Sequence, residues 1–277
     1  MKRTGIYCGS FDPITVGHLE SARRFIKKND IGTLYFLIDE KTANADRINR
    51  YCLIKKATSF FRHMNVADSI EDFKGISAVR LDESDEERKR SAEVRKGDFR
   101  ILPECLRRDV IESGIYADSI VRNSVNDHRY RHSVSVADLC CRLAEAHHLD
   151  SHKAFLIGIY HDIAKGMSDQ QMEEYMKVWK PYEYAYPAAV WHAYVGAYLL
   201  THDYGMKDEV MLKAIRHHCL GDHGDPYSKI VYIADKLDPS RGYDSSREID
   251  LALRDLDSAF ALVHLQQAEF LAGKEEK

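Results

Sequence analysis

The sequence predicts two domains, an N-terminal α/β domain in residues 1–120 and an all-helical domain in residues 121–277. Short apolar runs that alternate with helical spacing predict a parallel, doubly wound, Rossmann-like sheet in the first. From about Ser119 the helical spacing continues without any alternating strand pattern. The histidines mark the same division, since twelve of the 14 lie between residues 128 and 264. We expect the boundary within residues 117–124.

In the first domain, the elements follow a β-loop-α-β-α order. We expect a buried strand at 5–8, a turn at 9–13, a helix at 17–26, a strand at 33–38 and a helix at 48–64. The last helix places four apolar residues roughly on one stripe: Ile48, Leu53, Ala57 and Phe60.

The end of the first domain is more polar. Eight of the nine residues in 82–90 are charged, which predicts a solvated loop or an exposed helix. Residues 101–111 then predict a closing helix with Pro103 in its first turn.

The second domain contains only helical patterns. We expect helices near 129–148, 151–164, 168–178, 187–204, 207–219, 226–237 and 246–272.

Composition excludes several classes of protein. The net charge is −4, so no overall basic field attracts nucleic acid. No apolar run approaches the roughly 20 residues that a membrane span needs, and the N-terminus lacks a signal-peptide pattern. The six cysteines form no Cys-x-x-Cys pair, so we expect reduced thiols in a cytoplasmic protein.

One segment of the second domain carries candidate catalytic chemistry. An apolar helical run ends in His161 and Asp162, followed by Lys165 and the helix-stopping Gly166. Imidazole is a neutral nitrogen ligand, a carboxylate can bridge two cations, and a nearby ammonium can meet an anionic substrate. Lys165 has a simpler alternative, a solvated cation near the helix C-terminus.

Four further candidates lie in separate helical segments: His132, His192, His218 and Asp235. Burying such groups alone in apolar helices costs roughly several kcal/mol per charge. A shared cation would offset that cost for all of them. His217 competes with His218, and the other histidines of this half are interpreted as surface or supporting residues.

The order of these residues resembles the metal-dependent phosphohydrolases of the HD superfamily. Across residues 125 to about 270, the segments around His132, His161, His192, His218 and Asp235 are similar to the YqeK family. That resemblance implies an all-helical enzyme with two metal ions, which hydrolyses diadenosine tetraphosphate symmetrically to two ADP.

The resemblance also implies roles for individual residues. His132, His161, Asp162 and Asp235 would hold one metal, and His192 and His218 the other, with Asp162 bridging. Lys165, Arg131 and Arg241 would bind substrate phosphate, although Arg241 could also be a plain loop cation. Two cations would produce a hydroxide from water at neutral pH. The family implies iron, and nitrogen and oxygen ligands without cysteine also suit manganese or another divalent ion.

The first domain contains the run Gly9-Ser-Phe-Asp-Pro-Ile-Thr-Val-Gly-His-Leu19, which resembles the signature of cytidylyltransferase-like nucleotidyltransferases. A strand, a tight turn and a helix N-terminus together suit phosphate. Residues 101–116 look like the closing segment of nicotinate-nucleotide adenylyltransferases. The resemblance implies nucleotide binding by Gly9, Ser10, Phe11, Thr15, His18, Ser91 and Arg95.

The first domain is shortened relative to that family. Only residues 73–90 replace its middle strands, and the second motif survives as Ser91–Arg95 at best. We therefore expect a degraded domain that retains a binding, assembly or packing role. The alternatives are a bifunctional enzyme that also adenylylates nicotinate mononucleotide, a nucleotide sensor without activity, and a hydrolase of another nucleotide or phosphate ester. The sequence leaves a homodimer open.

Overall fold

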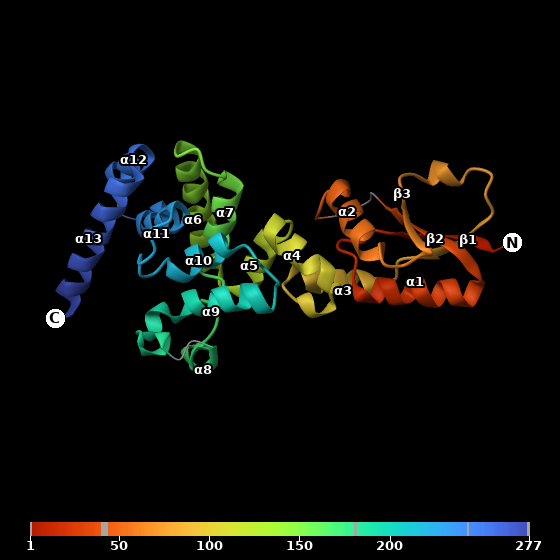
Figure 1. Ribbon diagram of the computed structural model, residues 1–277, viewed down its shortest axis with the longest axis horizontal. Coiled ribbons are helices and arrows are strands. Elements are labelled where there is room, and N and C mark those ends of the chain that lie inside the picture. The colour runs from red at the N-terminus through yellow and green to blue at the C-terminus, as the bar shows by residue number, and fades with distance from the viewer. Residues whose placement is uncertain (1, 40–43, 180–181, 243, 276–277) are drawn as a thin grey trace. The chain divides into compact units, whose positions relative to one another are not determined.

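The computed structural model describes residues 2–39, 44–179, 182–242 and 244–275. The chain divides into two compact units, Met1–Ile120 and Val121–Lys277. Among the described residues, no helix combines the length and the apolar character needed to cross a membrane. The predicted fold class is confirmed: a parallel α/β unit is followed by a helical unit (Figure 1).

The first unit contains a parallel sheet of four described strands in the order β3-β2-β1-β4. The strands are β1 (Arg3–Gly9), β2 (Ile31–Ile38), β3 (Met64–Ala67) and β4 (Ala78–Asp82). The central strand β1 is the most buried, and it pairs with β2 on one side and β4 on the other. The strand order therefore reverses direction between β1 and β4.

Helices and short 3-10 turns connect and follow these strands. They are α1 (Val16–Asn29), α2 (Arg47–Thr58), η1 (Ile70–Phe73), α3 (Asp85–Arg95), η2 (Phe99–Ile101), α4 (Glu104–Ser113) and α5 (Ala117–Ser124). On one face of the sheet, Tyr7, Phe11 and Phe36 form an aromatic cluster. On the other, Phe73 packs with Ile6, Cys8 and Ala67.

Three expectations for the first unit were wrong. Helix α2 ends at Thr58 rather than at Met64, and strand β3 begins at Met64, the last residue of the predicted helix. Of the proposed apolar stripe, Leu53 and Ala57 are buried, whereas Ile48 and Phe60 are 75% and 80% exposed. Pro103 is the N-cap residue before α4 rather than part of its first turn.

The charged segment 82–90 is largely exposed and helical from Asp85, as predicted, but two of its side chains turn inward. It contains the end of β4 and the start of α3, and two of its carboxylates, Glu83 and Glu87, are buried. Each has polar partners inside the unit, because Tyr7 donates to Glu87 at 2.7 Å and Ser10 donates to Glu83 at 2.7 Å. In a run of charged residues, the sequence does not show which side chains point into the core.

The second unit is helical throughout its described length. Its elements are α6 (Asp127–Ala146), α7 (Ser151–Tyr160), α8 (Asp169–Trp179), η3 (Glu183–Ala185), α9 (Ala188–His202), α10 (Glu209–His217), α11 (Pro226–Leu237), η4 (Pro239–Arg241), α12 (Ser246–Arg254) and α13 (Leu256–Glu275). The helix predicted at 246–272 is two helices. The chain breaks at Asp255, whose side chain accepts a hydrogen bond from the Ser258 backbone N–H at the start of α13.

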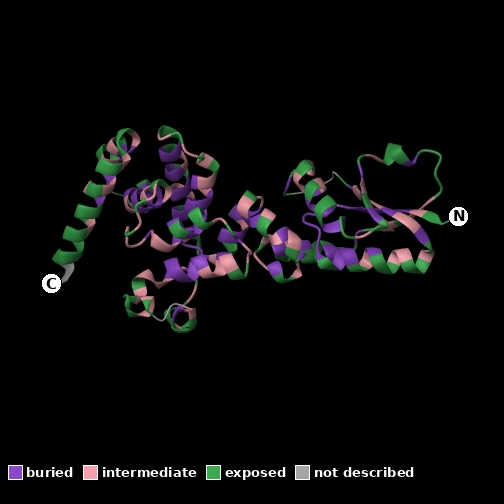
Figure 2. Ribbon diagram, in the orientation of Figure 1, coloured by how far each residue is buried: buried purple, intermediate pink, exposed green. Residues whose placement is uncertain are grey.

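The core of the second unit is built on α6, α7 and α11 (buried residues are purple in Figure 2). Helices α6 and α7 approach closely at Gly158. A Cβ atom there would lie only 2.6 Å from the Cα atom of Ala137. The glycine therefore sets the separation of two helices that carry His132 and precede His161.

Gly158→Ala should destabilise the second unit by about 1–3 kcal/mol, because the added methyl group meets backbone atoms and the helices must separate. Chemical unfolding monitored by circular dichroism measures this. Gly273→Ala is the control, since nothing lies within 4 Å of a Cβ at that exposed helical position. Equal stability of the two variants would contradict the close approach.

Candidate functional site

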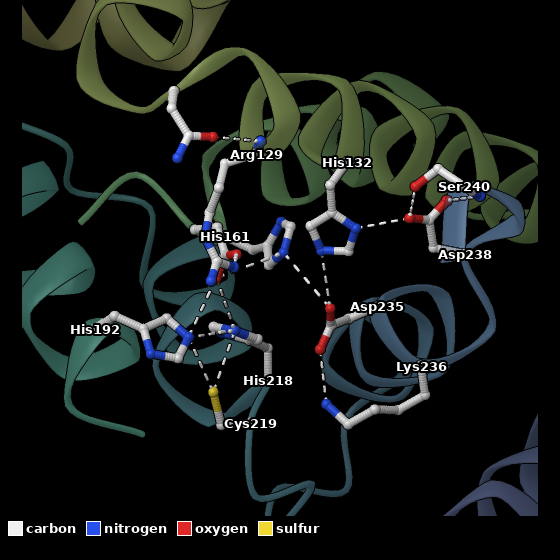
Figure 3. A network of polar contacts seen from close by, with 12 residues as sticks. Arg129, His132, His161, His192, His218, Cys219, Asp235, Lys236, Asp238 and Ser240 are labelled. Atoms are coloured by element: carbon white, nitrogen blue, oxygen red, sulfur yellow. Dashed lines mark hydrogen bonds and ion pairs between the residues drawn. The ribbon is translucent and has the colours of Figure 1, made fainter. Parts of the chain in front are cut away.

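The six side chains predicted as metal ligands come together in the second unit. They are contributed by α6 (His132), the residues after α7 (His161 and Asp162), α9 (His192), the residue after α10 (His218) and α11 (Asp235). Five of them, all but Asp162, are labelled in Figure 3. All six are between 0% and 7% exposed. Several apolar helices thus converge on a small, strongly polar centre.

The local sequence explains how these side chains are presented. Helix α7 is apolar and buried from Ala154 to Tyr160, and it ends as the chain reaches His161. The histidine and aspartate therefore project from the end of a helix that core packing holds in place. In α11, Asp235 follows the buried residues Ile233 and Ala234 in the same way.

The ligand atoms form two groups. In the first, the His132 and His161 Nε2 atoms lie 3.1 and 3.8 Å from Asp235 Oδ1, and His132, His161 and Asp162 have ligand atoms within 4.8 Å of one another. In the second, the His192 and His218 Nε2 atoms are 3.3 Å apart. Asp162 Oδ1 reaches both groups, at 3.7 Å from His161, 3.1 Å from His192 and 3.6 Å from His218.

Hydrogen bonds orient three of the four imidazoles. His161 Nδ1 lies 2.6 Å from the Gly158 carbonyl oxygen, and His218 Nδ1 lies 2.7 Å from that of Ile215. A carbonyl only accepts, so both rings donate from Nδ1 and turn Nε2 toward the centre. His132 Nδ1 is anchored in turn by the Asp238 carboxylate at 2.6 Å. Such supporting bonds are typical of histidines that ligate metals.

The arrangement fits divalent cations for a physical reason. His161 Nε2 is buried and has no hydrogen-bond partner among the described residues, and its lone pair faces the Asp162 and Asp235 carboxylates. Lone pairs and carboxylates at these distances repel one another unless positive charge lies between them. Cations with nitrogen and oxygen ligands would supply that charge.

The pKa shifts of the carboxylates and imidazoles in this centre are consistent with the same requirement for positive charge. Burial alone would raise the pKa of Asp162, but His161, His192 and His218 hold it well below its usual range. Burial opposes protonation of His132, yet its bonds to Asp235 and Asp238 raise its pKa to about 9. Burial lowers the pKa of His161 to about 4, so this imidazole is neutral at pH 7 and free to act as a ligand.

A cavity of about 680 Å³ opens beside this centre. Asp162, His192 and Asp235 line it together with three cationic side chains, Arg129, Lys165 and Lys236. The aromatic rings of Tyr232 and His264, which are stacked 5.7 Å apart, also line it. Cations for phosphate and aromatic surfaces for a base therefore lie next to the candidate metal ligands.

The three predicted phosphate-binding residues lie in different surroundings. It places Lys165 in the cavity wall. Arg131 is exposed and donates from Nε to the Asp127 carbonyl of its own helix, so the structure does not bring it to the centre. The arginine that reaches the centre is Arg129, 3.3 Å from Asp162. Arg241 ends η4, and its side chain lies outside the described residues.

Sequence reasoning missed four residues of the centre: Arg129, Cys219, Lys236 and Asp238. The most consequential is Cys219, because the predicted ligand set contained no thiol. Its Sγ atom lies 3.2 and 3.3 Å from the Nε2 atoms of His192 and His218, and burial is outweighed by His218, which lowers the Cys219 pKa to about 5. Its position directly after His218 was the available signal.

Asp238 and Lys236 flank Asp235 in the run Asp-Lys-Leu-Asp. Lys236 donates to Asp235 Oδ2 at 2.7 Å, which leaves Oδ1 facing His132 and His161. Asp238, fully buried, orients His132. Their spacing after an apolar helix could have indicated a supporting role.

In the first unit, the predicted nucleotide-binding residues turn inward. Phe11 is fully buried in the aromatic cluster, and His18 and Thr15 are fully buried beside it. Ser91 donates to the Pro13 carbonyl at 2.8 Å, and Arg95 donates to the Asp12 carbonyl. Ser10, which follows Gly9, donates to Glu83.

The fold and the centre define the class of protein: a helical domain with clustered His and Asp side chains of the HD type. Residues 129–240 match the family described as "HD domain". A symmetrical bis(5'-nucleosyl)-tetraphosphatase from Bacillus subtilis is 36% identical over 143 residues, which are 50% of this chain and 77% of that protein.

The chain therefore belongs to the HD-domain hydrolase family that includes this Bacillus protein. A probable nicotinate-nucleotide adenylyltransferase/Ap4A hydrolase from Mycoplasma pneumoniae is 32% identical over 173 residues, 59% of this chain. The chain spans about half the length of this relative. A solved structure, a predicted HD superfamily hydrolase involved in NAD metabolism from Clostridium acetobutylicum, aligns with a TM-score of 0.49 at 26% identity, covering 57% of this chain and 87% of that one.

Asp162→Ala should abolish metal binding at both ligand groups, because its Oδ1 atom faces histidines of each. Metal content after reconstitution with Fe²⁺ or Mn²⁺ and desalting measures this. Asp138→Ala removes an exposed aspartate of α6 and should retain the wild-type content. Full occupancy in the Asp162 variant would exclude a bridging role.

Proposed function

We propose that the second unit is a metal-dependent hydrolase that cleaves diadenosine tetraphosphate symmetrically to two ADP in the cytoplasm. One observation carries the proposal: Asp162 Oδ1 faces both groups of candidate ligands, and they border a cavity lined by three cationic side chains. The names of the Bacillus and Mycoplasma relatives support this substrate.

In this proposal, His132, His161, Asp162 and Asp235 hold one cation, and His192 and His218 hold the second together with Asp162. Iron is the expected metal, and the ligands also suit manganese. Cys219 adds a thiolate to the second group and would favour a softer ion there. Two such cations, when bound, supply Lewis-acid activation of water and neutralise charge at the attacked phosphorus.

The chain's own residues position the substrate. Lys165 lines the cavity, Arg129 lies beside Asp162, and Lys236 lies beside Asp235. A polyphosphate with several negative charges can span these cations. Fixed cations of this kind stabilise the charge that develops on phosphoryl oxygens during the reaction.

The adenosine groups would use the apolar part of the cavity. Tyr232 and His264 offer stacked rings, and Phe270 and Leu271 of α13 add apolar surface. Aromatic faces bind nucleobases with little dependence on base identity. A hydrolase of another nucleotide polyphosphate is therefore the alternative for this same site, and a nucleotide screen separates the two.

The products test the proposal directly. Diadenosine tetraphosphate should yield ADP alone, measured by ion-exchange chromatography of the reaction mixture. ATP together with AMP would show asymmetric cleavage and exclude the proposed reaction.

Lys165→Ala should lower turnover roughly 100-fold, because one fixed cation at the phosphates is lost. Metal content should stay at the wild-type level, since Lys165 is not among the grouped ligands. Lys177→Ala is the matched control, because that lysine pairs with Glu173 on the surface of α8. A loss of metal in the Lys165 variant would show a structural role instead.

A second candidate function is suggested by the name of the Mycoplasma relative, which joins adenylyltransferase and hydrolase activities. We expect little or no dinucleotide synthesis from nicotinate mononucleotide and ATP. Two reactants must be held in near-attack positions, and a misplacement of about 1 Å costs roughly 100-fold in rate. Ser91 and Arg95 are already engaged by the chain's own carbonyl groups.

His18→Ala should leave tetraphosphate hydrolysis nearly unchanged, because His18 belongs to the first unit. Parallel assays of synthesis and hydrolysis on wild type and variant measure this. Strong synthesis by the wild type that His18→Ala abolishes would establish the bifunctional alternative.

A further inference from the structure

In the sheet of the first unit, the carboxyl ends of β1 and β4 lie next to each other. These strands are parallel neighbours, with Cys8 paired to Asp82, and the strand order reverses between them. In open α/β sheets, ligands bind outside the carboxyl ends of strands at such a reversal. The residues that directly follow the two strands are Ser10 and Glu83.

The side chain of Glu83 fills this position. Its Oε2 atom accepts hydrogen bonds from the Ser10 backbone N–H at 2.7 Å and from the Ser10 hydroxyl at 2.8 Å. Its Oε1 atom lies 2.9 Å from His18 Nε2. The Glu83 and His18 side chains are both fully buried, and Arg88 approaches Oε2 at 3.4 Å from the exposed side.

The hydrogen bonds of His18 determine which of its ring nitrogens carries the proton. The Thr15 backbone N–H lies 3.0 Å from His18 Nδ1, and a backbone N–H can only donate. Nδ1 is therefore the acceptor, and Nε2 carries the hydrogen and donates it to Glu83. The fold thus holds a histidine near the start of α1 as a donor aimed at an anion.

Gly9, Ser10 and His18 together surround the Glu83 carboxylate, and we call these three residues the cradle. A Cβ atom at Gly9 would lie 2.7 Å from Glu83 Cβ and 3.0 Å from Glu83 Oε2. Because Gly9 has no side chain, the Glu83 side chain can pack directly against the backbone there. Burial alone would raise the pKa of Glu83, but the bonds from His18 and Ser10 lower it. The cradle holds a buried, ionised anion with at least three donors, which is how proteins satisfy such a charge.

We propose that this cradle is an oxyanion site for polyphosphate that Glu83 occupies with its own carboxylate, so that the wild-type first unit is closed to nucleotide triphosphates. A phosphate oxygen uses the same donors as a carboxylate oxygen. A bound phosphate and an ionised Glu83 cannot share the cradle, because like charges within a few ångströms repel in a buried site. Glu83, rather than a lack of donors, excludes the ligand. This inference does not depend on the proposed hydrolase activity.

The experiment uses the full chain without added metal, and inorganic tripolyphosphate as the probe. Isothermal titration calorimetry compares the wild type with Glu83→Ala and with the isosteric Glu83→Gln. Glu83→Ala should gain a binding site that the wild type lacks, with affinity at least about tenfold tighter than any wild-type binding in the first unit. Glu83→Gln, which removes the charge but keeps the volume, should gain a weaker one. Glu83→Ala combined with His18→Ala should lose the gained site.

Glu87→Ala is the matched control. Glu87 is also a buried glutamate of the same segment, but it bonds to Tyr7 and Ser84 rather than to Ser10 or His18, so its loss should add no site. Tetraphosphate hydrolysis should be the same in the Glu83 variants and the wild type, which separates this test from that of the second unit.

Two results would overturn the proposal. One is a folded Glu83→Ala variant without additional tripolyphosphate binding, and if that variant fails to fold, the same result for Glu83→Gln decides. The other is wild-type binding of equal strength that His18→Ala removes, since the cradle would then be open despite Glu83.

Discussion

The second unit depends on the interaction between buried carboxylates and imidazole nitrogens. Asp162 and Asp235 lie at the meeting point of several apolar helices, where a lone carboxylate would be strongly destabilising. Their oxygens face the Nε2 atoms of four histidines. Only added positive charge makes this arrangement favourable, and protons or metal cations can supply it. The folding of the unit and its proposed catalysis therefore rest on the same charges.

Packing makes that charge arrangement specific. Gly158 brings α6 and α7 together, and its carbonyl oxygen also fixes the ring of His161. Asp238 fixes His132 in the same manner, with a carboxylate in place of the carbonyl. The positions of the Nε2 atoms that face the centre are thus set by hydrogen bonds made behind the rings, which is why residues outside the centre can control its geometry.

The sequence predicted which His and Asp side chains come together, and it predicted their surroundings poorly. Polar residues within apolar helical runs, such as His192 and Asp235, are detectable because their burial needs an explanation. Arg129 and Arg131 lie two positions apart on one helix, and only the rotation of α6 about its axis decides which one faces Asp162. Cys219 could not be assigned, because a thiol beside a histidine is equally compatible with a plain core position. The strands β3 and β4 were missed because they are short and only partly buried.

The contrast between Asp162 and Glu83 shows why buried carboxylates must be judged by their partners. Both are nearly inaccessible, and burial opposes the charge of both. Glu83 faces N–H and O–H donors, so its charge is already satisfied by the chain and it has no need of a ligand. Asp162 faces the Nε2 atoms of three imidazoles and accepts from Arg129 on its other oxygen only at 3.3 Å, so its charge needs protons or a cation at those nitrogens. The first arrangement closes a site and the second creates one. The partner atoms, more than the presence of motif residues, therefore determine whether a buried carboxylate is satisfied by the chain or needs a cation.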